Sequence, residues 1–230
     1  GIECDWRRTG ELRVADAEWQ IPQLHDEAAL RNEYGDHVEV LSAEQVQARV
    51  KSPTYLGALW DPDGTALVDP ARLVWGLERA CLKLGVKIFE NSEVTSLEDT
   101  REGVIAHTPY GSIYAQKVAL ATNVFKSLVR SARKYVVPVY DFQLVTEPLS
   151  AEQLEAIGWE GREGISESRN QFHYYRMTAD NEILWGGYDA IYNFRGKVRQ
   201  EYETSADTYA HLAADFLETF PQLKGIKFTH

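Results

Sequence analysis

The spacing of apolar and polar residues predicts a chain of short strands and amphipathic helices. The clearest helix covers residues 70–84, with Asp69 as the N-cap, Pro70 at the first helical position and Gly85 at the end. One side of this helix is an apolar stripe at helical spacing, formed by Leu73, Leu77, Ala80, Cys81 and Leu84. We therefore expect the helix to pack on a sheet through this stripe.

Short apolar runs next to this helix predict the strands of that sheet. We expect strands at 86–90 and 117–123, with a hairpin of two strands, 103–108 and 112–116, between them. A helix, a strand, a small hairpin and a further strand follow one another in many dinucleotide-binding sheets. The helix should pack on strands 86–90 and 118–121, with Thr122 and Asn123 at the carboxyl edge of the sheet.

Other elements are predicted on both sides of this region. Ser42 and Ser150 are N-caps that form capping boxes with Gln45 and Gln153, which explains why the hexapeptides at 41–46 and 149–154 are nearly identical without requiring a repeat. Strands are expected at 54–60 and 136–148, a hairpin at 171–178 and 182–188, and an amphipathic helix at 205–220.

Composition and charge exclude several classes of function. The chain has 230 residues, and its net charge of −11 disfavours a nucleic-acid surface, which depends on Lys and Arg. No apolar run is long enough to span a membrane. The only cysteines, Cys4 and Cys81, do not form a disulfide framework, so we expect a reducing, cytoplasmic location. The six histidines have no metal-ligand spacing, so no metal site is predicted.

The hairpin at 171–188 carries the richest candidate chemistry. Strand alternation places His173 and Tyr175 on one face, and Tyr174 and Arg176 on the other. One of these faces could form an aromatic wall over a flat ligand, or the rings could equally be cross-strand pairs of a half-buried sheet. Arg176 suits a bidentate contact with a carboxylate, or an ion pair on the surface. His173 alone is more typical of a structural histidine than of a catalytic one.

The strand end at "ATN", residues 121–123, is where a ligand lies in open α/β sheets. The same small residues also suit close packing of a strand against a helix. The sequence contains no GxGxxG fingerprint and no Walker loop, the usual backbone cradles for a diphosphate. The acidic "DPDG" at 61–64 is typical of a turn and lacks the further ligands of a calcium loop.

The order of these motifs resembles a known family. Residues 67–98 ("LVDPARLVWGLERACLKLGVKIFENSEVTSLE") are followed by "GVIAHTPYGSIYAQKVALATN", "VPVYDFQLVTEPLS" and "FHYYRMTADNEILWGGYDA". Together they resemble D-amino-acid-oxidase-like FAD-dependent oxidoreductases, such as glycine oxidase, sarcosine oxidase and γ-glutamylputrescine oxidase. The resemblance extends from about Leu41 to the end of the chain.

The resemblance implies a mixed α+β and α/β fold, in which part of a doubly wound FAD-binding domain is interleaved with a mostly antiparallel substrate-domain sheet flanked by helices. Residues 65–130 would belong to the FAD domain, and residues 1–64 and 131–230 to the substrate domain. The family oxidises the carbon–nitrogen bond of an amine or amino acid by hydride transfer to FAD. By resemblance, Val94, Ala121, Thr122 and Asn123 are the cofactor-binding candidates.

The same resemblance identifies the chain as a central fragment, because the family's glycine fingerprint and its C-terminal flavin segment both lie outside it. The substrate-binding candidates are His173, Tyr174, Tyr175 and Arg176, and no catalytic residue is assigned. We expect the fragment alone to be inactive and not to bind FAD, and the surfaces exposed by truncation to lie in water or to join two copies of the chain. The alternative is a non-catalytic interaction domain built on the antiparallel sheet.

Overall fold

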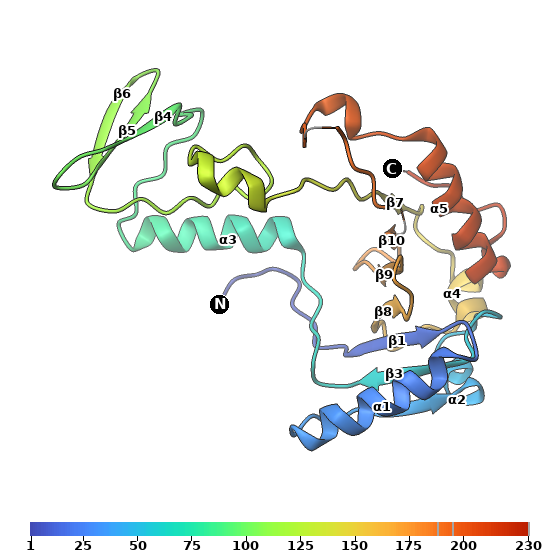
Figure 1. The fold of residues 1–230 in the computed structure, drawn as a ribbon. Coiled ribbons are helices and arrows are strands. Elements are labelled where there is room, and N and C mark those ends of the chain that lie inside the picture. The colour runs from blue at the N-terminus through green and yellow to red at the C-terminus, as the bar shows by residue number, and fades with distance from the viewer. Residues whose placement is uncertain (188, 195, 230) are drawn as a thin grey trace. The chain divides into compact units, whose positions relative to one another are not determined.

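The computed structural model describes residues 1–187, 189–194 and 196–229 (Figure 1). Its strands are β1 (Glu11–Ala15), β2 (Glu39–Ser42), β3 (Gly57–Asp61), β4 (Ser96–Asp99), β5 (Val104–Thr108), β6 (Gly111–Ala115), β7 (Gln143–Val145), β8 (Gly164–Glu167), β9 (His173–Met177) and β10 (Ile183–Gly187). Its α-helices are α1 (Gln20–Glu33), α2 (Ala43–Arg49), α3 (Pro70–Lys83), α4 (Ala151–Ile157) and α5 (Ala206–Thr219). Short 3-10 helices are η1 (Arg130–Tyr135), η2 (Gln200–Tyr202) and η3 (Pro221–Leu223).

The chain divides into two compact units. The first contains Gly1–Gly76, Tyr140–Ile191 and Glu203–His230, and the second contains Leu77–Val139 and Tyr192–Tyr202. The mixed α and β class expected from the sequence is confirmed: the first unit holds a mixed sheet and the second an antiparallel one.

The first unit is built on a seven-stranded sheet in the order β2-β3-β1-β8-β9-β10-β7. The pair β1 and β8 is parallel, and every other neighbouring pair in this sheet is antiparallel. The predicted hairpin is confirmed as β9 and β10, which pair antiparallel with Tyr174 opposite Gly186. Since side chains alternate along each strand, this register decides which residues share a face.

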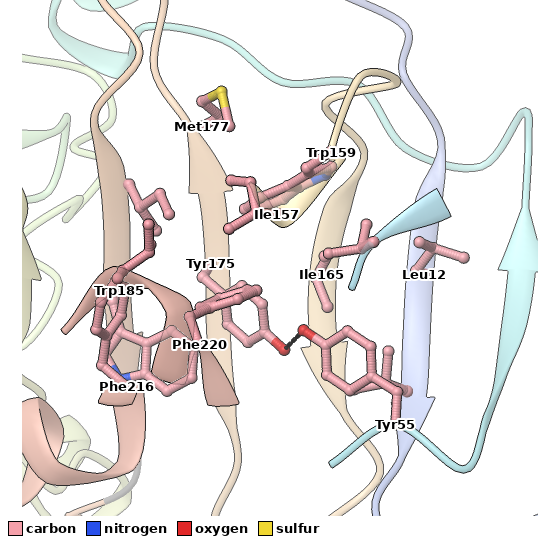
Figure 2. Close-up of a cluster of buried hydrophobic side chains, with 14 of the residues drawn as sticks. Leu12, Tyr55, Ile157, Trp159, Ile165, Tyr175, Met177, Trp185, Phe216 and Phe220 are labelled. Atoms are coloured by element: carbon pink, nitrogen blue, oxygen red, sulfur yellow. Dashed lines mark hydrogen bonds between the residues drawn. The ribbon is translucent and has the colours of Figure 1, made fainter. Parts of the chain in front are cut away.

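One face of the sheet carries the main core. Leu12, Ile165 and Trp185 point into it from β1, β8 and β10, and helices α2, α4 and α5 cover it with Val46, Ile157 and Phe216. Figure 2 shows the aromatic part of this core, in which Phe216 and Phe220 meet the ring of Trp185. Large aromatic side chains bury the most apolar area per residue, so this cluster is a principal source of stability.

The other face is covered only in part. Helix α1 packs Leu24 and Ala28 against Ala15 and Leu59, at the end of the sheet formed by β1, β3 and β2. On this face β8 presents Ser166, β9 presents Tyr174 and Arg176, and β7 presents Gln143, all of them half-buried or exposed. This part of the face is therefore polar and open.

Local signals in the sequence predict the starts of α2, α3, α4 and α5 accurately. The side chains of Ser42 and Ser150 accept hydrogen bonds from the backbone N–H of Gln45 and Gln153, whose side chains complete both capping boxes. Asp69 Oδ1 accepts a hydrogen bond from the backbone N–H of Arg72, as expected for the cap of α3. The predicted helix at 205–220 is confirmed as α5.

The predicted strands at 86–90 and 117–123 are wrong, because neither segment is paired in a β-ladder of the described structure. The predicted hairpin between them is confirmed as β5 and β6, which β4 extends to a three-stranded sheet. A strand forms only where a neighbour pairs its N–H and C=O groups, and an apolar run does not encode that neighbour. The apolar side chains of these segments are accordingly exposed, among them Val86, Ile88, Phe89, Val118 and Leu120.

The apolar stripe of α3 does not pack on the predicted sheet either. Leu77 is 49% exposed and Leu84 is 84% exposed, although both belong to the stripe. The long strand expected at 136–148 is shorter than predicted: β7 covers only Gln143–Val145, with isolated bridges at Tyr140 and Thr146. Pro138 has no N–H to donate to a ladder, which is consistent with the strand starting after it.

Candidate functional site

The open part of the sheet holds a polar cluster centred on Tyr174. Its hydroxyl donates a hydrogen bond to Asp141 Oδ2 at 2.6 Å and accepts one from Gln143 Nε2 at 2.9 Å. Burial of the phenol, and secondly its bond to Asp141, raise the pKa of Tyr174 to about 12. Tyr174 is thus held as a neutral phenol whose hydroxyl has a fixed position and direction.

Gly186 makes room for this arrangement. It lies opposite Tyr174 in the β9–β10 pair. A Cβ atom at this position would lie 2.8 Å from Gln143 Cγ and 3.1 Å from Tyr174 Cζ, closer than side chains normally approach. The glycine therefore lets the tyrosine ring and the glutamine side chain lie flat across the sheet.

Arg176 lies on the same face, two residues further along β9. It is opposite Leu184 in β10 and is half-buried. Within the described part of the chain, its guanidinium has neither a hydrogen bond nor an ion pair. A guanidinium with unused donors beside a fixed phenol is suited to binding a carboxylate or another polar group of a small molecule.

His173 and Tyr175 lie on the opposite, buried face. His173 is 2% exposed and stacks on Trp185 with ring centroids 4.6 Å apart. Its Nδ1 is 3.0 Å from Glu167 Oε2, and its Nε2 is 3.3 Å from Asp215 Oδ2. The histidine thus links the end of β8 to α5, and its role in this position is structural.

The Tyr175 hydroxyl is 2.6 Å from that of Tyr55 (Figure 2). Burial raises the pKa of both phenols. Partial burial likewise raises the pKa of the Asp215 carboxyl, while the nearby His173 acts in the opposite direction. The four candidates are therefore divided into a pair on the open face, Tyr174 and Arg176, and a pair in the core, His173 and Tyr175.

Asp141 and Gln143 complete the cluster, and neither residue was predicted from the sequence. A signal for them exists in "DFQL", where the buried Phe142 and Leu144 alternate with the exposed Asp141 and Gln143. This period of two places both polar side chains on the face that also carries Tyr174.

The cofactor-binding candidates lie in the second unit, outside any strand. Val94 and Thr122 are half-buried, while Ala121 and Asn123 are exposed. Thr122 accepts a backbone hydrogen bond from Phe125 in a turn, where Asn123 has a φ of 46°. The sequence contains no GxGxxG fingerprint, the usual backbone cradle for the diphosphate of a dinucleotide such as FAD.

The described ranges contain neither a candidate metal centre nor a candidate membrane span. No group of three or more His, Cys, Asp or Glu residues there is arranged to hold a metal ion. No helix in the described ranges is both long and apolar enough to cross a membrane.

Comparison with known proteins is consistent with this geometry. Residues 1–230 match the family described as FAD dependent oxidoreductase. The chain is 29% identical to γ-glutamylputrescine oxidoreductase of Escherichia coli and 27% identical to the probable oxidoreductase OrdL of Haemophilus influenzae, each over 100% of this chain and 51% of the relative. The chain therefore spans about half the length of these curated relatives.

A solved structure supports the same fold. Glycine oxidase from Geobacillus kaustophilus superposes with a TM-score of 0.78 at 16% identity, over 100% of this chain and 59% of that protein. At this level of identity the likeness concerns the fold alone.

Proposed function

This chain belongs to the FAD-dependent oxidoreductase family, and we propose that it is the central part of a longer enzyme that oxidises the carbon–nitrogen bond of an amine or amino acid. The observation that carries the proposal is the open polar face of the sheet, with a fixed phenol at Tyr174 and free guanidinium donors at Arg176. Small-molecule sites orient their ligands with a few precisely placed polar groups of this kind.

In this proposal the two residues bind and orient the substrate. The Tyr174 hydroxyl, held by Asp141 and Gln143, offers an oxygen in a fixed place to a substrate N–H. Arg176 pairs with a carboxylate or carbonyl of the same molecule. His173 and Tyr175 act indirectly, because they anchor β9 to the core and thereby fix the position of Tyr174.

FAD supplies the hydride acceptor for this class of oxidation, and the protein supplies orientation and exclusion of water. Because the sequence contains no GxGxxG fingerprint for the diphosphate of FAD, we propose that most of the cofactor is held by parts of the longer protein beyond this chain. The exposed apolar segments 84–90 and 118–120 are proposed to pack against those parts.

The test is to isolate the full-length flavoprotein that contains this chain and to add candidate substrates without oxygen. We expect an amine or amino acid to bleach the oxidised flavin spectrum, and the product to be the corresponding carbonyl compound after hydrolysis of the imine. Alcohols of the same carbon skeleton should leave the spectrum unchanged. A colourless full-length protein would contradict the proposal and favour an interaction domain.

A further inference from the structure

A second polar site lies on the other side of the sheet, away from Tyr174. A cavity of about 410 Å³ lies between the end of α2 and the loop that joins α4 to β8. This volume is within the range of small-molecule sites. Its charged lining residues are Arg49, Lys51, Glu155, Glu160 and Glu163, which carry one net negative charge.

Glu163 is the unusual member of this lining, because its side chain is only 4% exposed. Its Oε1 is 3.1 Å from Arg49 Nη1, and Arg49 in turn lies over the ring of Trp60 at 4.4 Å. Its Oε2 is buried and has no hydrogen-bond partner among the described residues. A buried carboxylate oxygen without a donor is costly, so a ligand that donates a hydrogen bond there is stabilised.

Gly161 lies directly beside this carboxylate. A Cβ atom at position 161 would lie 2.3 Å from Glu163 Oε1 and 2.7 Å from Oε2. The backbone of Gly161 has no positive φ, so its conformation does not itself require glycine. What the glycine provides is room for the Glu163 carboxylate to lie against the backbone.

The remaining charges decide the class of ligand. Arg49 is already paired with Glu163, and Lys51 Nζ donates a hydrogen bond to the backbone carbonyl of Glu155 at 3.1 Å. An anion in the cavity would face the unpaired carboxylate oxygen and be repelled. We propose that this cavity binds a small organic cation with an ammonium group, whose N–H donates to Glu163 Oε2.

The test uses butylammonium chloride as the probe and NMR of the backbone amides of Gly158, Gly161 and Glu163 as the readout. We expect saturable shifts of these amides in the millimolar range, and none with sodium chloride at the same ionic strength. Uncharged n-butanol, which has the same length, should not produce them. Equal shifts with n-butanol, or no saturation with butylammonium, would overturn the proposal.

Two variants address the site directly. Glu163→Gln removes the charge, and Gly161→Ala places a methyl group against the carboxylate while keeping every charge. Each should weaken butylammonium binding at least tenfold. The control, Glu152→Gln, removes the same charge from an exposed position of α4 and should leave binding unchanged.

Lys51→Met separates this proposal from its nearest rival, in which the Lys51 ammonium itself moves to Glu163. The proposal predicts equal or tighter butylammonium binding in this variant, because a like charge has been removed. Binding that appears only in Lys51→Met would show that Lys51 occupies the site, and would overturn the proposal.

Discussion

His173 and Tyr174 are consecutive residues of β9, yet their side chains lie on opposite faces of the sheet. His173 is held in the core between Glu167 and Asp215, whereas the Tyr174 hydroxyl is hydrogen-bonded to Asp141 on the open face. The strand thus carries an anchor and a candidate substrate contact side by side. This arrangement separates stability from substrate binding, so the two can be tested by different substitutions.

The first prediction concerns the ionisation of Tyr174. Its pKa of about 12 exceeds the ordinary value of 10.0, so the folded protein retains this proton more strongly than the unfolded chain does. The stabilisation from this group is fully present below pH 10 and is lost as the pH rises through about 12. NMR of protein labelled with ¹³C at tyrosine Cζ measures this pKa, and the resonance that disappears in Tyr174→Phe is that of Tyr174. This resonance should titrate near pH 12. A midpoint near pH 10 would contradict the described contacts of Tyr174.

The second prediction concerns the anchor. Glu167 is buried, accepts a hydrogen bond from the His173 backbone N–H at 3.2 Å and lies 3.0 Å from its Nδ1. Removing one partner of a buried, hydrogen-bonded pair leaves the other unsatisfied, so Glu167→Ala should lower the free energy of unfolding by about 3 kcal/mol.

Urea denaturation measures this loss, and Glu33→Ala is the matched control. Glu33 is exposed at the end of α1, so its removal should change the free energy of unfolding by less than about 0.5 kcal/mol. Equal stability of the two variants would mean that Glu167 and His173 do not anchor β9.

The third prediction concerns FAD and the 230-residue chain by itself. We expect colourless protein and no saturable change of flavin fluorescence at micromolar FAD, because the sequence has no GxGxxG fingerprint to supply amides to the diphosphate. The few contacts that Val94 and the residues at 121–123 offer would not offset the cost of ordering a large flexible cofactor. A yellow preparation with about one flavin per chain would refute this expectation and locate a more complete site within the chain.

The sequence predicted best those features that depend on local chemistry. The capping boxes at Ser42 and Ser150, the cap at Asp69 and the β9–β10 hairpin are all specified within a few residues, and all are confirmed. The strands at 86–90 and 117–123 were wrongly predicted because strand formation depends on a partner, which a local apolar run does not reveal.

Among the first forty residues, β1 and α1 form although neither element was predicted from the sequence. Helix α1 begins at Trp19 without a side-chain cap and has no acidic residue in its first turn, so the usual start signals are absent. Gln20 fixes this start instead: its Oε1 accepts hydrogen bonds from the backbone N–H groups of Asp16 and Ala17, and its Nε2 donates to the Ser168 carbonyl. The contact with Ser168 joins residues that are far apart in the sequence, so no local pattern around Gln20 predicts it.

The sequence predicts which side chains of β9 share a face of the sheet. It does not predict which of the two faces is buried. The period of β9 separates Tyr174 and Arg176 from His173 and Tyr175, as predicted. Which pair is buried depends on the helices that pack on each side, and α5 is more than twenty residues away along the chain. Only the fold shows that α5 covers the histidine face.

The most direct test of the proposed function compares Tyr174→Phe with Tyr175→Phe in the full-length flavoprotein. Both remove one hydroxyl from neighbouring tyrosines and keep the ring. Tyr174→Phe should lower kcat/KM for the amine substrate about tenfold, because a positioned hydrogen bond is lost. Tyr175→Phe should leave kcat/KM within about twofold and lower the free energy of unfolding by about 1 kcal/mol, because its bond to Tyr55 is buried. Unchanged kcat/KM in Tyr174→Phe would contradict the assignment of the open face as the substrate site.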